Sequence, residues 1–387
     1  MQSIPYGRQT ICEADVSAVV DVLRSDWLTQ GPAVERFEGA MAQYCNAAHA
    51  VAACNATASL HLACKALELG EGDYLWTTPN TFVASANCAL YCGADVDFVD
   101  IDAKTYNMCP DTLADKLRYA ERNGRLPKIV IPVHFAGQPC EMQTIADLAK
   151  KYRFRVIEDA SHAVGALYNE EKIGSCNFSD ITVFSFHAVK VMTTGEGGML
   201  LTNSAELSRK LKMLSSHGIT RDPSLMSCEC EGSWFYEQLD LGANYRMTDF
   251  QAALGKSQLS RLDEFIERRR CLADQYDENL RDLPLQRPWQ SPKTRSAWHL
   301  YVIQLELREL RKTRRQVFDE LRSAGIGVNV HYIPVHLQPY YRTKGFQSGD
   351  FPCAERYYEA AITLPLHFGL TDSEQDYVIQ TLKNVLR

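Results

Sequence analysis

The sequence predicts an α/β fold in which helices cover both faces of a mostly parallel sheet. From about residue 50 to residue 202, short apolar strand-like runs alternate with helical patterns, as is typical of parallel strands joined by crossover helices. Near residue 250 the pattern changes to a long amphipathic stretch followed by a mixed tail. We therefore expect a large domain over residues 1–250 and a smaller C-terminal α+β domain over residues 251–387.

The elements of the large domain follow from the spacing of apolar residues. The sequence predicts, in order, a helix at 59–67, strands at 94–99 and 128–133, a helix at 141–151, and strands at 155–157, 181–186 and 199–202. In sheets of this class the loops after the carboxyl ends of the strands collect the ligand site. The polar residues that follow these strands are therefore the first candidates for function.

The elements of the C-terminal domain are a long helix, one strand and two closing helices. Residues 250–280 are expected to form one amphipathic helix, with Arg268, Arg269 and Arg270 on its solvent-facing side. A strand is predicted at 298–303, and helices at 311–324 and 372–386.

Composition excludes several classes of function. Forty-one basic and 48 acidic side chains give a net charge of −7, which argues against a general nucleic-acid binder with a basic face. No apolar run approaches the roughly 18–20 residues of a membrane span, and the first ten residues lack the layout of a secretory signal. The thirteen cysteines are odd in number and scattered, and they lack the spacing of a zinc site. We therefore expect a cytoplasmic protein that has no metal and binds neither nucleic acid nor membrane.

Two glycine-containing segments fail the common nucleotide-binding patterns. Gly255-Lys256-Ser257 resembles the end of a phosphate loop, but Phe250 stands where that motif requires glycine. The run Gly195–Gly198 is not followed by the glycine of a dinucleotide-binding motif, because residue 200 is leucine. Nucleotide hydrolysis and nicotinamide chemistry thus lack their usual signatures.

Two loop-to-helix junctions are candidate binding segments. In Asn55–Ser59, small residues open a helix whose free N–H groups suit a phosphate, although a simple helix cap by Thr57 or Ser59 is an equal alternative. In Thr81–Ser85, Phe82 is placed to stack on a flat heterocycle. The alternative for Phe82 is packing in the core.

Asp159 and Lys190 carry the reactive chemistry. Asp159 follows a predicted strand, where a carboxylate can hold the proton of a pyridinium ring; a helix cap or a metal ligand is the alternative. Lys190 lies in a short polar loop between two apolar strands. An amine enclosed there has a lowered pKa, which suits Schiff-base formation with an aldehyde. Ser185, in the preceding strand, is a second candidate phosphate donor.

These segments, taken together, strongly resemble the nucleotide-sugar aminotransferases of the DegT/DnrJ/StrS family. The matching blocks run in order from about residue 26 to the C-terminus and include residues 55–58, 81–85, 158–162, 185–190, 196–198, 242–248 and 330–336. The resemblance implies a fold-type-I transferase that depends on pyridoxal 5′-phosphate (PLP) and forms a homodimer with shared active sites.

The resemblance also implies a role for each cofactor-binding residue. Lys190 is expected to form the Schiff base with PLP, Asp159 to pair with the pyridine nitrogen, and Phe82 to stack on the ring. His162 stands where glutamine is common near the phenolic oxygen of the cofactor. The phosphate is expected to be held by Ala56, Thr57 and Ser185, and by Asn244 from the partner subunit.

The implied reaction transfers an amino group from L-glutamate to a nucleotide-linked keto sugar. The pattern is closest to the enzymes of pseudaminic acid synthesis that make UDP-4-amino-4,6-dideoxy-N-acetyl-β-L-altrosamine. Alternatives are the enzyme that makes UDP-4-amino-4-deoxy-L-arabinose, another 4-amino-sugar aminotransferase, or a PLP-fold regulator without turnover. Lys190 and the lack of an added DNA-binding segment argue against the regulator. Candidate substrate residues are His187, Arg246, His331 and Tyr332, with Arg221 and His217 as further sources of positive charge.

Overall fold

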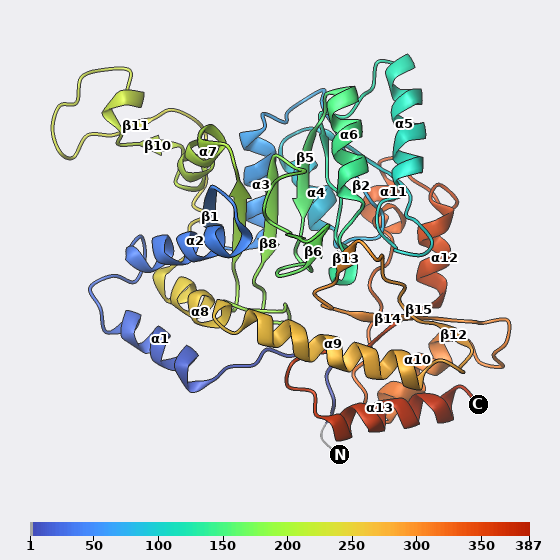
Figure 1. Ribbon diagram of the computed structural model, residues 1–387. Coiled ribbons are helices and arrows are strands. Elements are labelled where there is room, and N and C mark those ends of the chain that lie inside the picture. Colours follow the sequence, from blue (N-terminus) through green and yellow to red (C-terminus); the bar gives the residue numbers. More distant parts are fainter. Residues whose placement is uncertain (1–2) are drawn as a thin grey trace.

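Seven strands form the central sheet of the large domain (Figure 1). The structure is a computed structural model that describes residues 3–387. The strand order is β1-β9-β8-β5-β4-β2-β3, and only β9 runs antiparallel to its neighbours. The strands are β1 (His49–Ala53), β2 (Tyr74–Thr77), β3 (Asp95–Phe98), β4 (Ile129–Val130), β5 (Arg155–Asp159), β8 (Ile181–Ser185) and β9 (Gly198–Thr202). The predicted mostly parallel sheet is confirmed.

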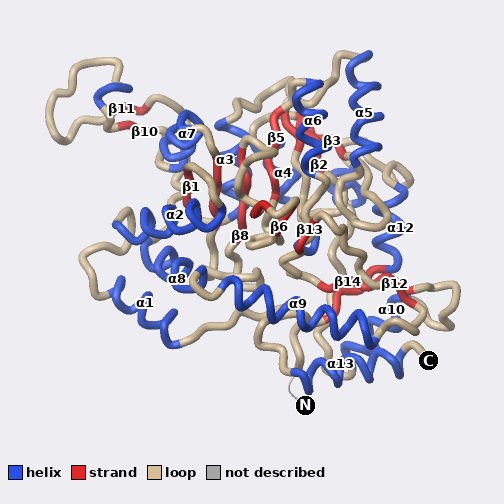
Figure 2. Tube along the Cα trace, viewed as in Figure 1, coloured by secondary structure: helices blue, strands red, loops and turns tan. Residues whose placement is uncertain are grey.

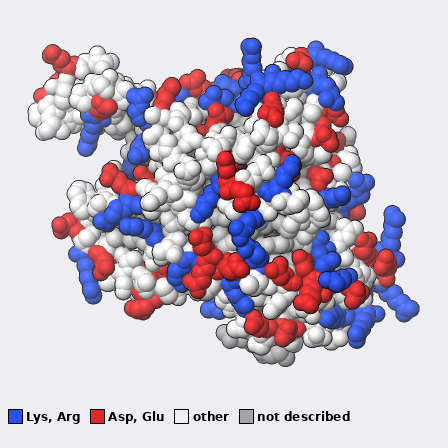
Figure 3. Space-filling view, in the orientation of Figure 1, with Lys and Arg blue, Asp and Glu red and all other residues white. Residues whose placement is uncertain are grey.

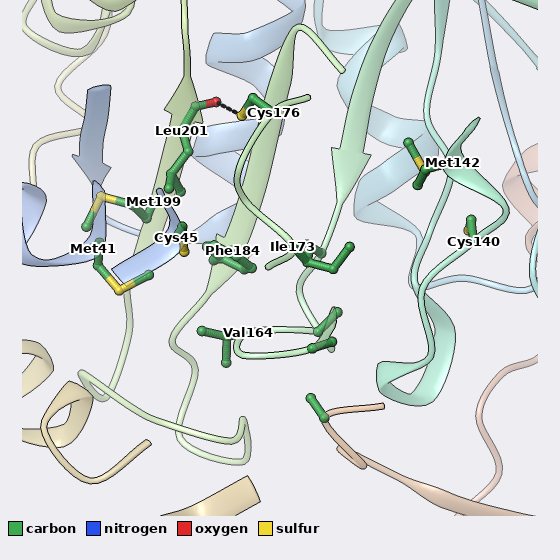
Figure 4. Close-up of a cluster of buried hydrophobic side chains, with 14 of the residues drawn as sticks. Met41, Cys45, Cys140, Met142, Val164, Ile173, Cys176, Phe184, Met199 and Leu201 are labelled. Carbon is green, nitrogen blue, oxygen red and sulfur yellow. Dashed lines mark hydrogen bonds between the residues drawn. The ribbon is translucent and has the colours of Figure 1, made fainter. Parts of the chain in front are cut away.

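Helices cover both faces of this sheet, as Figure 2 shows. One face carries α3 (Ala56–Ala66), α4 (Ala84–Tyr91) and α7 (Ala205–Ser215), and the other carries α2 (Pro32–Cys45), α5 (Pro110–Arg122) and α6 (Met142–Tyr152). Successive strand residues enter opposite cores: Val183 packs with the first set of helices and Phe184 with the second. In Figure 4, Met41 and Cys45 of α2 lie near Phe184 and Met199 in this second core. Burial on both faces explains why the strands appear in the sequence as continuous apolar runs.

The predicted helix at 250–280 is two helices. The chain forms α8 (Asp249–Leu259) and α9 (Leu262–Asn279), with a break at Ser260 and Arg261. At the break, Arg261 Nη2 donates to Asp15 Oδ2 at 2.7 Å, and Asp15 belongs to α1 (Glu13–Leu23). The two helices have different partners, because α8 packs on α1 and α2 whereas α9 continues to the small domain (Figure 1). Apolar periodicity alone did not reveal this change of partner.

The predicted exposure of Arg269 is wrong. Its side chain is buried, and Nη1 donates to the carbonyl oxygens of Trp298 and His299 at 3.2 Å and of Leu366 at 2.8 Å. Burial lowers the pKa of Arg269 to about 10. Phe265, Arg269 and Leu272 lie three and four residues apart, so the arginine belongs to the buried face of α9.

A three-stranded antiparallel sheet is the centre of the C-terminal domain. Its strands are β12 (Leu285–Gln286), β14 (Tyr301–Leu305) and β15 (Ala361–Leu364). The predicted closing helices are confirmed as α10 (Arg314–Ser323) and α13 (Asp372–Val385). The predicted strand at 298–303 starts later, at Tyr301, because Trp298 has a positive φ of 48°. Ile4 bridges Ile326, so the N-terminal segment contacts this domain.

Short elements complete the described chain. They are β6 (Leu167–Tyr168), β7 (Glu171–Lys172), β10 (Ile219–Thr220), β11 (Glu237–Gln238), β13 (Thr294–Arg295), α11 (Pro339–Arg342), α12 (Pro352–Ala360) and the 3₁₀ turns at 135–137, 223–225 and 335–337. Strands β10 and β11 pair at the base of an arm that stands away from the body of the molecule (Figure 1). Basic and acidic side chains are interspersed on the face drawn in Figure 3.

All thirteen cysteines have free thiols. Within residues 3–387, none of the helices combines the length and the apolar character that crossing a membrane requires.

Candidate active site

The carboxyl-terminal ends of β5 and β8 face a cavity of about 600 Å³. Ten of the predicted site residues line it: Ala56, Thr57, Phe82, Asp159, His162, Ser185, His187, Lys190, His331 and Tyr332. They come from both domains, and the sheet topology brings them together. The position of the cavity agrees with the rule that α/β sheets bind ligands beyond their strand ends.

Lys190 lies in the loop that connects β8 to β9. Its backbone N–H donates to the carbonyl oxygen of His187 at 2.9 Å, which closes a tight turn. Burial lowers the pKa of Lys190 to about 8, against an opposing effect of the nearby Asp159 carboxylate. At this pKa roughly a fifth of the amine is neutral near physiological pH, far more than for a free lysine, and attack on an aldehyde requires the neutral form.

Asp159 is the last residue of β5 and is fixed by two donors. Ser85 Oγ donates to its Oδ2 at 2.6 Å, and the Ser161 N–H donates to its Oδ1 at 3.1 Å. Thr81 Oγ1 lies 2.8 Å from Ser85 Oγ and extends this chain of contacts. The sequence does not predict this role of Ser85, although Ser85 ends the Thr81–Ser85 segment.

A buried pair behind Asp159 holds the end of the strand. His134 Nε2 and Glu158 Oε2 are 2.7 Å apart, and the His134 N–H donates to the Asp159 carbonyl at 3.1 Å. Hydrogen bonds from His134, Ser179 and Thr182 outweigh burial and lower the pKa of Glu158. These contacts fix the backbone from which the Asp159 carboxylate projects.

The N-terminus of α3 opens into the cavity with free N–H groups. The cap residue is Asn55, whose Oδ1 accepts from the Ala58 N–H at 2.8 Å, so the predicted caps Thr57 and Ser59 are wrong. The N–H groups of Ala56 and Thr57 have no acceptor in the described part of the chain. Unpaired N–H groups at a helix N-terminus suit a phosphate, so the residues present fit the phosphate of PLP.

Gly198 allows α3 to approach the sheet closely. It pairs with Ala53 of β1 on one side and Ser185 of β8 on the other. A Cβ at this position would lie 2.4 Å from Ser59 Oγ and 2.6 Å from the Asn55 carbonyl. Glycine therefore brings the amino end of α3 and Ser185 to the same side of the cavity.

Aromatic rings and imidazoles form the remaining wall. Phe82 is 59% exposed, so its interpretation as a core residue is wrong, and its ring centre lies 6.3 Å from that of Tyr332. Burial lowers the pKa of His162 well below its usual value and that of His331 to about 3. His299, which the sequence did not indicate, lies 4.5 Å from His162 between ring centres. The sequence does not predict a site role for His299, because it precedes a strand of the C-terminal domain and only the folded chain brings it to the cavity.

Asn244 and Arg246 do not line this cavity. Asn244 forms a backbone bridge with Ser216, and Arg246 Nη1 donates to Ser216 Oγ at 2.9 Å. Arg221 and His217 are also outside the lining. The single chain thus provides the predicted cofactor residues except Asn244, which was expected to act in the partner's site.

Comparison with known proteins identifies the family of this chain. The pattern of the DegT/DnrJ/EryC1/StrS aminotransferase family matches residues 9–383. The chain belongs to this family. The spore coat polysaccharide biosynthesis protein SpsC of Bacillus subtilis (strain 168) is 39% identical over 387 residues, which span 99% of this chain and 97% of SpsC.

Two solved structures show the same fold over nearly the full length. Spr1654 from Streptococcus pneumoniae in its PLP form matches with a TM-score of 0.89 and 33% identity, and the match covers 99% of this chain and 98% of that one. Helicobacter pylori PseC, an aminotransferase involved in the biosynthesis of pseudoaminic acid, matches with a TM-score of 0.91 and 29% identity, covering 100% and 99%. The chain is therefore a PLP-dependent sugar aminotransferase with the fold of the type-I transferases.

Proposed function

We propose that this aminotransferase moves the amino group of L-glutamate to the 4-keto carbon of a UDP-linked 4-keto-6-deoxy sugar. The proposed product is UDP-4-amino-4,6-dideoxy-N-acetyl-β-L-altrosamine. The observation that carries the proposal is one cavity in which a lysine with a lowered pKa lies near a carboxylate fixed by two donors. The similarity to PseC supports the choice of sugar.

Lys190 is the proposed acid and base. When bound, PLP supplies an electron sink for a carbanion next to nitrogen. The Lys190 amine then removes the proton from the α-carbon of glutamate and later delivers a proton to C4 of the sugar. A base positioned in this way contributes about 10²–10⁴-fold to the rate. Delivery from one face sets the configuration of the new amine.

The other lining residues bind and orient. Asp159, with Ser85 behind it, holds a proton on the ring nitrogen of the cofactor. Ala56, Thr57 and Ser185 bind the phosphate. His187 lies at the exposed mouth of the cavity, with Nε2 3.8 Å from Glu196 Oε1. His331 and Tyr332 are the proposed contacts of the sugar. Arg246, which lies outside the cavity of its own chain, is proposed to contact the diphosphate in the partner subunit's site.

A homodimer completes the proposed site. Phe82 in the cavity lining, and Tyr91 and Leu241 outside it, expose 59%, 56% and 75% of their surfaces, and exposed large apolar side chains favour contact with a partner. Asn244 belongs to the segment next to Leu241 and does not reach the cavity of its own chain. We propose that it binds the phosphate in the partner subunit's site.

We also propose that the enzyme works in the cytoplasm. The free state of all thirteen thiols supports this location, because reducing conditions there keep cysteines from forming disulfides.

A panel of UDP-, dTDP- and GDP-linked 4-keto sugars, each with L-glutamate, tests the substrate. NMR of the product is expected to show turnover of the UDP-linked 4-keto precursor of the altrosamine, with amination at C4. Equatorial amination of a D-configured sugar alone would contradict the altrosamine product. Preference for the UDP-4-keto-pentose would indicate the alternative, UDP-4-amino-4-deoxy-L-arabinose.

A further inference from the structure

The backbone of Ala136 fixes which nitrogen of His162 carries the proton. The Ala136 N–H donates to His162 Nδ1 at 3.3 Å, and Ala136 holds a positive φ of 57° in the turn at 135–137. A backbone N–H donates and never accepts, so Nδ1 must be the unprotonated nitrogen. The proton of the neutral ring is therefore on Nε2.

His162 Nε2 faces the hydroxyl of Tyr332. The distance between Nε2 and Tyr332 Oη is 3.1 Å. Because Nε2 carries the proton, it donates and Tyr332 Oη accepts. A positively charged His162 would direct an Nδ1–H at the Ala136 N–H, and burial lowers its pKa well below the usual value. Burial and this backbone contact both favour the neutral ring.

The hydroxyl hydrogen of Tyr332 is consequently free to point into the cavity. Within residues 3–387, His162 is the only hydrogen-bond partner of Tyr332 Oη. Tyr332 lines the cavity, and its ring centre lies 6.3 Å from that of the exposed Phe82. We propose that His162 is a positioning residue that makes Tyr332 a hydrogen-bond donor to an oxygen acceptor of the sugar substrate. The identity of this ligand rests on the proposed function, whereas the direction of the hydrogen bond does not.

This arrangement places a hydrogen-bond donor, rather than an acceptor, at this point of the cavity wall. A donor at this point favours carbonyl, ether or anionic oxygens over groups that can only donate. Glutamine at position 162 would preserve the direction of the hydrogen bond, because its amide oxygen accepts from Ala136 and its NH₂ group donates to Tyr332. An ionised glutamate would reverse it, because both of its oxygens accept. Leucine would remove both contacts.

Neutron diffraction from crystals of the deuterated PLP-bound enzyme tests the direction of the bond. The expected result is deuterium on His162 Nε2, none on Nδ1, and a Tyr332 O–D group that points into the cavity. Deuterium on Nδ1, or a Tyr332 O–D group aimed at Nε2, would overturn the inference. The result does not depend on which sugar is turned over. An error in the proposed substrate can therefore be distinguished from an error in the direction of the hydrogen bond.

Substitutions test the link between the two residues. Tyr332→Phe and His162→Leu are each expected to raise KM for the sugar nucleotide about tenfold, and His162→Gln, which keeps both contacts, is expected to raise it less than His162→Leu does. In the Tyr332→Phe background, His162→Leu is expected to cause no further increase in KM for the sugar nucleotide, because His162 acts on the sugar only through the Tyr332 hydroxyl. The proposal would be overturned if the two substitutions multiplied each other's effect on KM in the double variant. An unchanged KM in Tyr332→Phe would also overturn it. Circular dichroism and the PLP absorption band distinguish these outcomes from a folding defect.

Discussion

Lys190 and Asp159 acquire their properties from different surroundings. Enclosure by the cavity lowers the pKa of the Lys190 amine to about 8. The Asp159 carboxylate is held in place by donors from Ser85 and Ser161. The amine is thus available as a base, and the carboxylate is fixed in position near it, as the proposed chemistry requires.

The lowered pKa predicts a pH dependence for the binding of PLP. Lys190 is cationic below about pH 8 and neutral above it, and only the neutral amine attacks the aldehyde. The rate at which cofactor-free enzyme combines with PLP, measured by absorbance, is therefore expected to rise with pH with a midpoint near 8. A midpoint close to 10.5, the value of a free lysine, would contradict the assigned burial. Lys190→Ala, the control, is expected to form no covalent bond at any pH.

The sequence predicted the reactive residues but not the groups that support them. Lys190 and Asp159 were predictable because Lys190 lies in a short polar loop between two apolar strand runs and Asp159 lies at the end of one. Ser85, His134 and His299 contact the site through tertiary packing of segments far apart in the sequence. No local pattern distinguishes such residues from ordinary loop and helix residues.

At the scale of elements, the contact between α3 and β9 depends on Gly198. Substitution by alanine would place a methyl group 2.4 Å from Ser59 Oγ. We expect Gly198→Ala to lower the free energy of unfolding by about 1–3 kcal/mol and to weaken PLP binding, because α3 presents the N–H groups that are proposed to bind the phosphate.

Thermal unfolding and PLP titration of the cofactor-free protein measure both effects. Gly39→Ala is the matched control, since nothing lies within 4 Å of a Cβ at position 39 in helix α2. This control is expected to stabilise slightly, by about 0.5–1 kcal/mol. Equal unfolding temperatures and equal PLP affinities of the two variants would show that α3 does not pack tightly against β9 at Gly198.

Helix α9 depends on Arg269 for its contact with the small domain. Arg269→Met is expected to cost at least about 2 kcal/mol of unfolding free energy, because the carbonyl oxygens of Trp298, His299 and Leu366 lose their donor. The neighbouring Arg270 pairs with Glu267 at the surface, so Arg270→Met is expected to cost less than about 1 kcal/mol. Urea unfolding of both variants measures the difference. Similar costs would argue against a structural role for the buried guanidinium.

The limits of element prediction have physical causes. Strands β5, β8 and β9 were predicted because both faces are buried, which makes them continuously apolar. The break between α8 and α9 was missed because both halves remain amphipathic and only their packing partners change. The prediction that Arg269 is exposed was wrong because a run of three arginines does not indicate which of them faces buried carbonyl groups.

At the scale of the whole molecule, each of the two active sites of the proposed dimer contains residues from both subunits. If Asn244 acts in the partner's site, a subunit with Lys190→Ala and a subunit with Asn244→Asp together form one intact site per mixed dimer. Random reassortment is expected to restore about a quarter of wild-type activity, since half the dimers are mixed and each has one intact site.

A matched control distinguishes complementation from simple dilution. Lys190→Ala mixed with Asp159→Asn is expected to restore nothing, because both residues line the cavity of their own chain. Activity assays after subunit exchange, with sedimentation to confirm dimers, measure both mixtures. Equal activity of the two mixtures would contradict a shared site.

The overall architecture was predictable because composition, strand alternation and ordered motif blocks agreed with one another. The cavity itself was not, because its wall combines residues of both domains that only the folded chain brings together. The arm at β10 and β11 also lacked a sequence signal beyond its position between predicted elements.

The path of the amino nitrogen shows whether this enzyme transfers it from glutamate to the sugar. The PLP-bound enzyme is incubated with ¹⁵N-labelled L-glutamate and the UDP-linked 4-keto sugar, and the product is analysed by NMR. The account predicts ¹⁵N on C4 of the sugar with an equal amount of 2-oxoglutarate, and neither product with Lys190→Ala. Transfer that persists in Lys190→Ala, or ¹⁵N that never reaches the sugar carbon, would contradict it.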